Sequence, residues 1–151
     1  MAQENNIVFT TLDKIKWLEL IVTSYQKYHA AGNNVSVYIS FSDSISVKGL
    51  TPMHLVTLAC LIQFLSDQGW KAFLSHNNEA VDDYIYNDLQ FSEYWLGQKN
   101  HVDANQSTHV FNLWRIKDQE KDLYANNVEA YFKKTYFKNK DLSVIHLSLT
   151  E

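Results

Sequence analysis

Residues 51–69, TPMHLVTLACLIQFLSDQG, constrain the fold more than any other stretch, because their apolar residues repeat at helical spacing between two helix-end signals. Thr51 stands where an N-cap belongs, and Pro52 falls at the first helical position. Gly69 supplies the residue at which such a helix ends. The segment therefore predicts a helix with a buried stripe made of Leu55, Leu58, Ala59, Ile62 and Leu65.

Extended segments flank this helix on both sides. Residues 33–43, NNVSVYISFSD, alternate with a period of two, which is typical of a strand. The alternation places Val35, Val37, Ile39 and Phe41 on one face and Ser36, Tyr38 and Ser40 on the other. WKAFLS, residues 70–75, predicts a second strand, and a short extended piece is expected at 44–50. The order strand, helix, strand indicates a parallel pair joined by a crossover.

Three further helices are predicted from periodicity. The first spans 11–31, with Thr10 as cap and Gly32 as terminator, and its buried face is predicted to be Ile15, Leu18, Val22 and Tyr25. The second spans 77–89, with Asn77 or Asn78 as cap and Val81, Ile85 and Leu89 facing inward. The third spans 126–138, with one face made of Val128, Tyr131, Phe132, Thr135 and Tyr136.

The remaining segments complete the predicted architecture. Residues 98–108 are polar and loop-like, and 109–116, HVFNLWRI, indicate a strand covered on both faces. At the end of the chain, Asp141 or Ser143 could cap a helix whose one face carries Leu142, Ile145 and Leu149. We expect an α/β sandwich with a mixed or mostly parallel sheet and right-handed crossovers. It would occupy residues 1–140, with an N-terminal helix, and 141–151 would begin a helix that has no stop signal.

Composition limits the cellular compartment of the protein and the classes of partner that it can bind. A chain of 151 residues with 46% apolar residues fits one domain with a proper core. The formal charge of −4 argues against a nucleic-acid surface. A single cysteine, Cys60, excludes an internal disulfide and fits a reducing cytoplasm. No apolar run is long enough to span a bilayer, and the first residues do not form a signal peptide, so we expect a cytoplasmic location without membrane contact.

No residue pattern in the chain spells out a catalytic or metal site. The six histidines lack the short ligand spacings of tight zinc sites; they are His29, His54, His76, His101, His109 and His146. Cys60 lies beside an apolar stripe and is predicted to be a small core residue. Asp82 and Asp83 are neighbours on a predicted helix, where side chains point about 100° apart, so both are expected on a solvated face. We predict no catalytic residue and no cofactor for residues 1–151.

Residues 35–96 resemble the STAS domain, the fold of anti-sigma-factor antagonists and of the cytoplasmic tails of sulfate transporters. The matching pieces are VSVYISFSDSISVKGLTPMHLVTLACLIQFLSDQGWKAFLS and NNEAVDDYIYNDLQFSEYW. The resemblance covers less than half of the chain and implies a regulatory, protein-binding function of the kind found in bacterial signalling proteins. It also implies a hydrophobic plug after the last helix, which here would be Leu89, Phe91 and Trp95.

One departure from that family concerns its regulatory serine. Many STAS domains carry a phosphorylatable Ser in an Asp-Ser-Ser-Gly turn that opens the long helix, whereas this chain has TPMH at 51–54. Thr51 is the one hydroxyl in that turn and already has the role of N-cap, which we favour over a phosphorylation switch. A phosphate on Thr51 would sit at the positive end of the helix and change a partner-docking surface.

The last residues, DLSVIHLSLTE, resemble the start of the nucleotide-binding helix of histidine-kinase-type ATPases. Glu151 would match the Glu that prepares a water in that family, and the magnesium-binding Asn would fall four residues after it. The resemblance implies that 141–151 begin an ATPase domain, absent here, which would bind ATP and magnesium in a longer protein. The alternative is an ordinary C-terminal helix without a stop signal.

Three functions are compatible with these observations. The first is a non-catalytic module that docks a protein partner, or the ATPase domain itself, through a surface including Thr51, His54, Tyr136, Ile145 and Leu149. The second is a small α/β enzyme or nucleotide-binding protein with a site at the helix N-terminus, residues 49–55, centred on His54. The third is a dimerisation domain, in which exposed Tyr131, Tyr136, Ile145 and Leu149 would form a homodimer contact.

Overall fold

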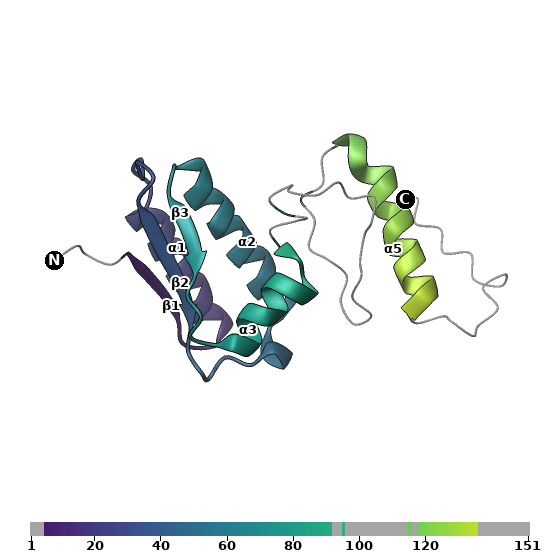
Figure 1. Ribbon diagram of the computed structural model, residues 1–151, viewed down its shortest axis with the longest axis horizontal. Helices are drawn as coiled ribbons and strands as arrows, with labels where there is room; N and C mark the ends of the chain where they lie inside the picture. The colour runs from purple at the N-terminus through teal and green to yellow at the C-terminus, as the bar shows by residue number, and fades with distance from the viewer. Residues whose placement is uncertain (1–4, 92–94, 96–114, 116–117, 136–151) are drawn as a thin grey trace. The chain divides into compact units, whose positions relative to one another are not determined.

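The computed structural model describes residues 5–91, 95, 115 and 118–135, and the chain divides into two compact units, Met1–Asn87 and Asp88–Glu151. The first unit holds the strands β1 (Asn6–Phe9), β2 (Ser36–Phe41) and β3 (Lys71–Leu74) (Figure 1). The helices α1 (Lys14–Lys27) and α2 (Pro52–Asp67) connect them, with a 3-10 turn, η1, at Val47–Gly49. After β3 come the short helix α3 (Glu79–Asp83) and a π-helical turn, η2 (Tyr84–Asp88).

The three strands form a parallel sheet in the order β1-β2-β3. Ile7 lies opposite Ile39 in the first pair, and Tyr38 lies opposite Phe73 in the second. Helices α1 and α2 pack against each other on one face of this sheet (Figure 1). Each helix connects one strand to the next strand in the sheet, and both connections run in the same direction across it. With the same handedness, both helices therefore lie on the same face. The predicted α/β class and the parallel sheet are thus confirmed for the described residues.

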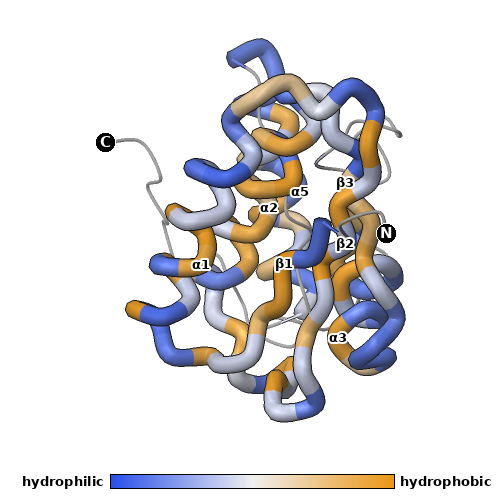
Figure 2. Tube along the Cα trace, turned by 90° about the vertical axis from the view of Figure 1, so that its left-hand side faces the viewer, coloured by the Kyte–Doolittle hydropathy of each residue, from blue (hydrophilic) through white to orange (hydrophobic). Residues whose placement is uncertain are grey.

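The core lies between the sheet and the two helices. The inward side chains of β1 and β2 are at most 2% exposed; they are Ile7, Phe9, Val37, Ile39 and Phe41. Trp17 of α1 packs on this layer, with its ring centroid 4.1 Å from that of Phe9. Figure 2 shows the apolar residues in orange along the strands and along α2. The opposite face of the sheet exposes Val8, Tyr38 and Phe73, each between 43% and 47%.

Four predicted elements are confirmed with small changes at their ends. Helix α2 begins at Pro52 after the N-cap Thr51 and buries Leu58, Ala59, Ile62 and Leu65, as the sequence indicates. Leu55 is half-buried rather than buried. The chain leaves the helix through Gly69, whose φ of +79° favours glycine. Strands β2 and β3 lie inside their predicted ranges, and α3 with η2 forms the helix predicted at 77–89, capped by Asn78.

Helix α1 forms where predicted but buries the opposite face. Its cap is Asp13 rather than Thr10, and the buried side chains are Trp17, Ile21 and Ser24. The predicted stripe is largely exposed, with Ile15 70%, Leu18 40% and Val22 54% exposed. The helix has two apolar faces, and the face that carries the large indole ring packs on Phe9 and Phe41 because it buries more apolar area.

One strand is missing from the predicted order, and two other predictions are wrong. Strand β1 was not predicted, because four residues give only two inward positions, Ile7 and Phe9. The extended piece expected at 44–50 contains the 3-10 turn η1. Cys60 is exposed rather than part of the core, because it lies on the side of α2 that faces away from the sheet.

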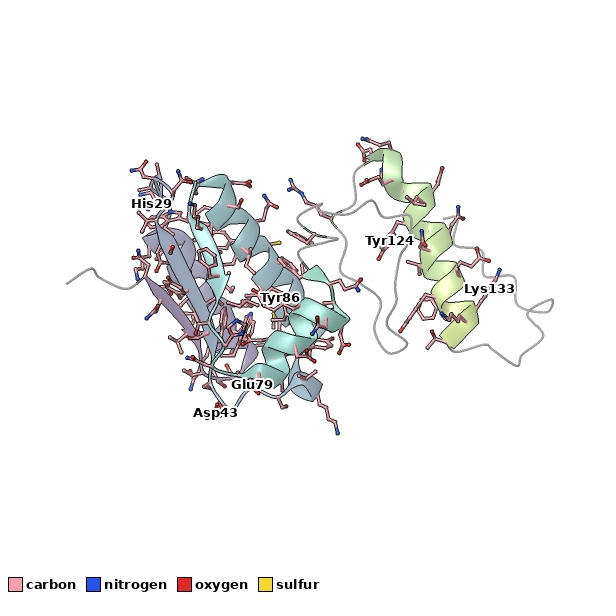
Figure 3. The ribbon with its side chains drawn as sticks, viewed as in Figure 1. His29, Asp43, Glu79, Tyr86, Tyr124 and Lys133 are labelled. Atoms are coloured by element: carbon pink, nitrogen blue, oxygen red, sulfur yellow. The ribbon has the colours of Figure 1, made fainter. Side chains whose placement is uncertain are left out.

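In the second unit the structure describes a 3-10 turn, η4 (Asp118–Glu120), followed by helix α5 (Lys121–Thr135). Figure 3 shows Tyr124 and Lys133 on this helix. It begins five residues before the predicted start at 126, and Tyr131, expected to be exposed in a dimer contact, is buried. Phe91 and Trp95 of the predicted plug stack with ring centroids 6.1 Å apart, and Leu89 is buried. The predicted loop at 98–108 and most of the strand at 109–116 lie outside the described residues.

Candidate functional site

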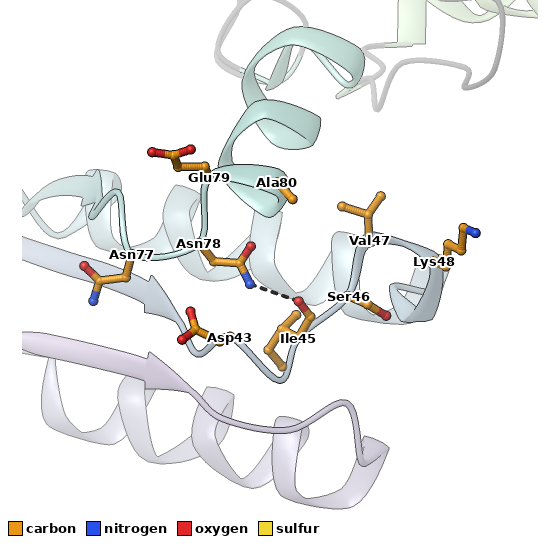
Figure 4. Close-up of a pocket in the computed structure, with 9 residues that line it drawn as sticks. All are labelled: Asp43, Ile45, Ser46, Val47, Lys48, Asn77, Asn78, Glu79 and Ala80. Atoms are coloured by element: carbon orange, nitrogen blue, oxygen red, sulfur yellow. Dashed lines mark hydrogen bonds between the residues drawn. The ribbon is translucent and has the colours of Figure 1, made fainter.

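An open hollow lies where strands β2 and β3 end, with a volume of about 560 Å³ (Figure 4). Its walls come from residues 43–48, which follow β2, and from residues 77–80, which follow β3. In open parallel sheets, ligands bind outside the carboxyl ends of the strands. We refer to residues 43–48 and 77–80 together as the strand-end surface.

The two halves of the strand-end surface are joined by Asn78. Its side-chain amide donates hydrogen bonds to the carbonyl oxygens of Ser42 (3.0 Å) and Ile45 (2.9 Å), the second of which is drawn in Figure 4. Its side-chain oxygen accepts from the backbone N–H of Val81 at 3.2 Å, which caps α3. Asn78 is 9% exposed, so these bonds satisfy a buried amide and hold the two loops together.

The first of these loops is also tied to the end of β1. The hydroxyl of Ser44 donates to the carbonyl oxygen of Thr10 at 2.9 Å, and it lies 2.7 Å from the hydroxyl of Ser42. The backbone N–H of Ser42 donates to the carbonyl oxygen of Phe9 at 2.9 Å. The loop after β2 is therefore held from two sides, by β1 and by Asn78.

The side chains on the strand-end surface carry both charges. Asp43, Lys48 and Glu79 are exposed there, together with the polar Ser46 and Asn77. Figure 3 shows Asp43 and Glu79 at the same end of the first unit. Such a surface can form ion pairs and hydrogen bonds with a partner while Val47 offers some apolar contact.

Thr51 and His54 lie at the start of α2 and form a capping pair. The Nδ1 atom of His54 accepts from the backbone N–H of Thr51 at 3.0 Å and lies 2.8 Å from the Thr51 hydroxyl. Its Nε2 atom donates to the carbonyl oxygen of Leu12 at 3.1 Å, which fixes the tautomer with the proton on Nε2. His54 is 1% exposed, and both of its ring nitrogens are occupied: Nδ1 caps α2, and Nε2 joins the start of α2 to the segment that leads into α1.

Asp82 differs from its prediction. It was expected on a solvated face with Asp83, but it is 3% exposed, whereas Asp83 is exposed. Neither carboxylate oxygen accepts a hydrogen bond from any residue that the structure describes. Its Oδ2 atom lies 3.7 Å from Nδ1 of His76, a side chain that is 79% exposed. Burial raises the pKa of Asp82, and the neighbouring His76 offsets part of this effect.

Tyr86 is the other titratable group near Asp82. Partial burial raises the pKa of its hydroxyl, and the charge of Asp82 raises it further. A backbone hydrogen bond with Leu74 acts in the opposite direction and connects η2 to the end of β3. Asp82 thus lies in a small polar cluster with His76 and Tyr86.

The other predicted site residues are scattered or undescribed. The ring of His29 is exposed, and its Nδ1 lies 2.6 Å from the carbonyl oxygen of Gln26. Tyr136, Ile145, Leu149, Glu151 and three of the histidines lie outside the described residues, so their predicted roles stay predictions. Within residues 5–91 and 118–135, no three His, Cys, Asp or Glu side chains are grouped as a metal site would need.

The spacing of the residues around Asp82 is a signal of its burial. Asp82 shares a helical face with Ile85, Tyr86 and Leu89, because these positions follow it by three, four and seven residues. A carboxylate within an otherwise apolar or aromatic stripe indicates a buried charge. The role of Asn78 as a clamp between loops had no comparable signal, because its partners are carbonyl groups more than 30 residues away.

No protein-family model, no curated protein and no solved structure matches this chain. Among the described helices, none is both long and apolar enough to cross a membrane.

Proposed function

We propose that this protein is a non-catalytic interaction module of the STAS-like regulatory type, and that it docks a protein partner through the strand-end surface. The observation that carries the proposal is the hollow at the carboxyl ends of β2 and β3, whose walls are held in place by Asn78 and Ser44. A prearranged surface binds with a smaller loss of conformational entropy than a loop that must first be ordered.

The shape of the hollow favours a protein over a small molecule. Sites for small ligands enclose most of the ligand's surface. The strand-end surface is open, and its exposed side chains include the charged Asp43, Lys48 and Glu79. Polar, charged and accessible surroundings are typical of the rim of a protein–protein interface.

The surroundings of His54 support a binding module over the enzyme hypothesis. A general base needs a ring nitrogen within reach of a substrate. In His54, Nδ1 is occupied by Thr51 and Nε2 by the Leu12 carbonyl group, and the ring is 1% exposed. The resemblance to STAS domains implies the same class of function, in a cytoplasmic setting that suits the single cysteine.

Two measurements test this proposal. A photo-crosslinking amino acid at Val47 should give one discrete crosslinked protein in cells that express the chain, whereas the same group at exposed Lys27 on α1 should not. Calorimetry with ATP, GTP and magnesium should show no binding by residues 1–151. Micromolar nucleotide binding, or equal crosslinking from Val47 and Lys27, would contradict the proposal.

Self-association is a second candidate, which the exposed face of α1 favours. Ile15, Leu18 and Val22 form an apolar stripe there, and Val56 of α2 is 42% exposed. Adjacent exposed apolar side chains of this kind are a common feature of contacts between protein copies. Light scattering over a range of concentrations tests it, and a chain that stays monomeric at high concentration excludes it.

A further inference from the structure

We propose that Asp82 is an anchor for an arginine side chain of the docked protein partner, whose guanidinium group reaches the carboxylate past His76. This inference rests on the proposed docking function and adds the chemistry of one partner residue. The site consists of the Asp82 carboxylate, with His76 at its solvent side and Tyr86 beside it.

The state of the Asp82 carboxylate is the first observation. The side chain is 4% exposed, and both oxygens lack a hydrogen-bond partner among the described residues. Buried polar groups in folded proteins are nearly always hydrogen-bonded, and an exception calls for an explanation. A carboxylate with only a structural role would have partners, as Asp13 does when its Oδ1 accepts the Lys16 backbone N–H at 3.0 Å.

The charge around Asp82 is the second observation. From residue 72 to residue 87 the chain carries Glu79, Asp82 and Asp83 but neither lysine nor arginine. Glu79 and Asp83 are exposed, so they add a negative potential outside the buried group. Lys48 lies on the adjoining strand-end surface, but within this stretch His76 alone can become a cation, so the segment that carries Asp82 favours a cationic ligand.

The position of His76 provides the approach. Its ring is 79% exposed while its Nδ1 lies 3.7 Å from Oδ2 of Asp82, so an exposed side chain lies directly beside the buried carboxylate. Turning this side chain to another rotamer requires no change in the backbone. A planar guanidinium could then donate two parallel hydrogen bonds to the two unpartnered oxygens, which a compact ammonium group cannot do.

The site also adjoins the strand-end surface. Asn77, Asn78 and Glu79 belong to that surface, and they lie between His76 and Asp82 in the sequence. The backbone N–H of Asp82 donates to the carbonyl oxygen of Asn78 at 3.0 Å, so the carboxylate is fixed relative to the clamp. A partner seated on the strand-end surface can therefore place one arginine against Asp82.

An NMR titration with methylguanidinium at constant ionic strength tests the anchor. In the wild-type chain, the ring signals of His76 and Tyr86 should shift and saturate at a concentration below about 100 mM, because a bidentate, charge-assisted pair with a buried carboxylate is stronger than an exposed ion pair. Asp82→Asn should reduce the apparent affinity at least about tenfold, because it removes the charge and keeps the shape. Asp83→Asn removes the same charge from the exposed neighbour and should leave the affinity within about twofold.

Methylammonium in the same titration distinguishes arginine from lysine. Weaker binding of methylammonium supports the proposed arginine, and tighter binding overturns it. Equal shifts in wild type and in Asp82→Asn, or no saturable shift in wild type, overturn the anchor altogether. If methylguanidinium does not bind but Val47 crosslinks to a partner, only the role of Asp82 as an arginine anchor is rejected. If Val47 does not crosslink, the docking function itself is rejected.

Discussion

His54 and Asp82 are both titratable, both almost fully buried and both close to the ends of the strands, yet their surroundings are opposite. The ring of His54 has a hydrogen-bond partner at each nitrogen, in Thr51 and in the Leu12 carbonyl group. The carboxylate of Asp82 has no hydrogen-bond partner in the described part of the chain. The first residue stabilises the contact between α1 and α2, while the second is a cost to the folded state.

The difference shows how a buried polar group can be assigned to structure or to binding. A group whose hydrogen bonds are all made inside the domain has nothing left to offer a ligand. A group that is held in the interior without partners destabilises the domain, and its presence is explained when a partner completes the site. By this criterion the region of His54 is structural, and the region of Asp82 fits the proposed interface.

The largest expected effect concerns the packing beside His54. Trp17 stacks on Phe9, lies 4.7 Å from the His54 ring and donates from Nε1 to the Thr57 hydroxyl at 3.0 Å. Trp17→Ala should lower the free energy of unfolding by about 3–5 kcal/mol, because it leaves a large cavity in the core. Urea denaturation measures the change, and Ile15→Ala, at a 70% exposed position of the same helix, should stay within about 0.5 kcal/mol.

Equal effects at Trp17 and Ile15 would contradict the description of α1 as a helix that buries Trp17 and exposes Ile15. Equal effects would also contradict the structural role that we assign to the region around His54.

A smaller effect is expected when the hydrogen bonds of His54 are removed. His54→Leu replaces the imidazole ring by an apolar side chain of moderate size. It leaves the Leu12 carbonyl oxygen and the Thr51 N–H without their hydrogen bonds to the ring. The free energy of unfolding should fall by about 1–3 kcal/mol, the cost of one unsatisfied buried group, because Leu12 and Thr51 are themselves only half-buried. Thermal and urea unfolding measure it, with His29→Leu at an exposed position as the control. An unchanged stability would mean that the ring is available for another role.

The sequence predicted the parts of the fold that depend on local signals. Helix α2 has a cap, a proline at its first position and a glycine after its end, and it forms where these signals place it. Strand β2 follows its alternation from Ser36 to Phe41. These elements could be predicted because the physical cause of each boundary lies within a few residues of it.

Features set by tertiary packing could not be predicted in the same way. Helix α1 has apolar residues on two faces, so periodicity alone did not decide between Ile15 and Trp17. The exposure of Cys60 depends on the side of α2 that faces the sheet, and the clamp at Asn78 depends on carbonyl groups distant in sequence. The burial of Asp82 could have been inferred from its place in the stripe with Ile85 and Leu89, but its lack of partners could not.

The pH dependence of stability tests the central contrast most directly. Burial raises the pKa of Asp82 in the folded chain above its value in the unfolded chain, despite the opposing effect of His76. The protonated Asp82 carboxyl therefore makes its full contribution to the free energy of unfolding below about pH 4. This contribution is lost as the pH rises through the pKa of Asp82 in the folded chain.

We therefore expect Asp82→Asn to exceed the wild type in unfolding free energy by about 1–2 kcal/mol at pH 7, since the amide cannot ionise. The difference should shrink toward zero as the pH is lowered below about 4, where Asp82 is protonated in both states. Asp83→Asn should show no such pH-dependent gain, and His76 and Tyr86, the titratable groups that face Asp82, stay unchanged in both variants. An Asp82→Asn chain that is less stable than the wild type at pH 7 would contradict the account, because the carboxylate would then have favourable partners of its own.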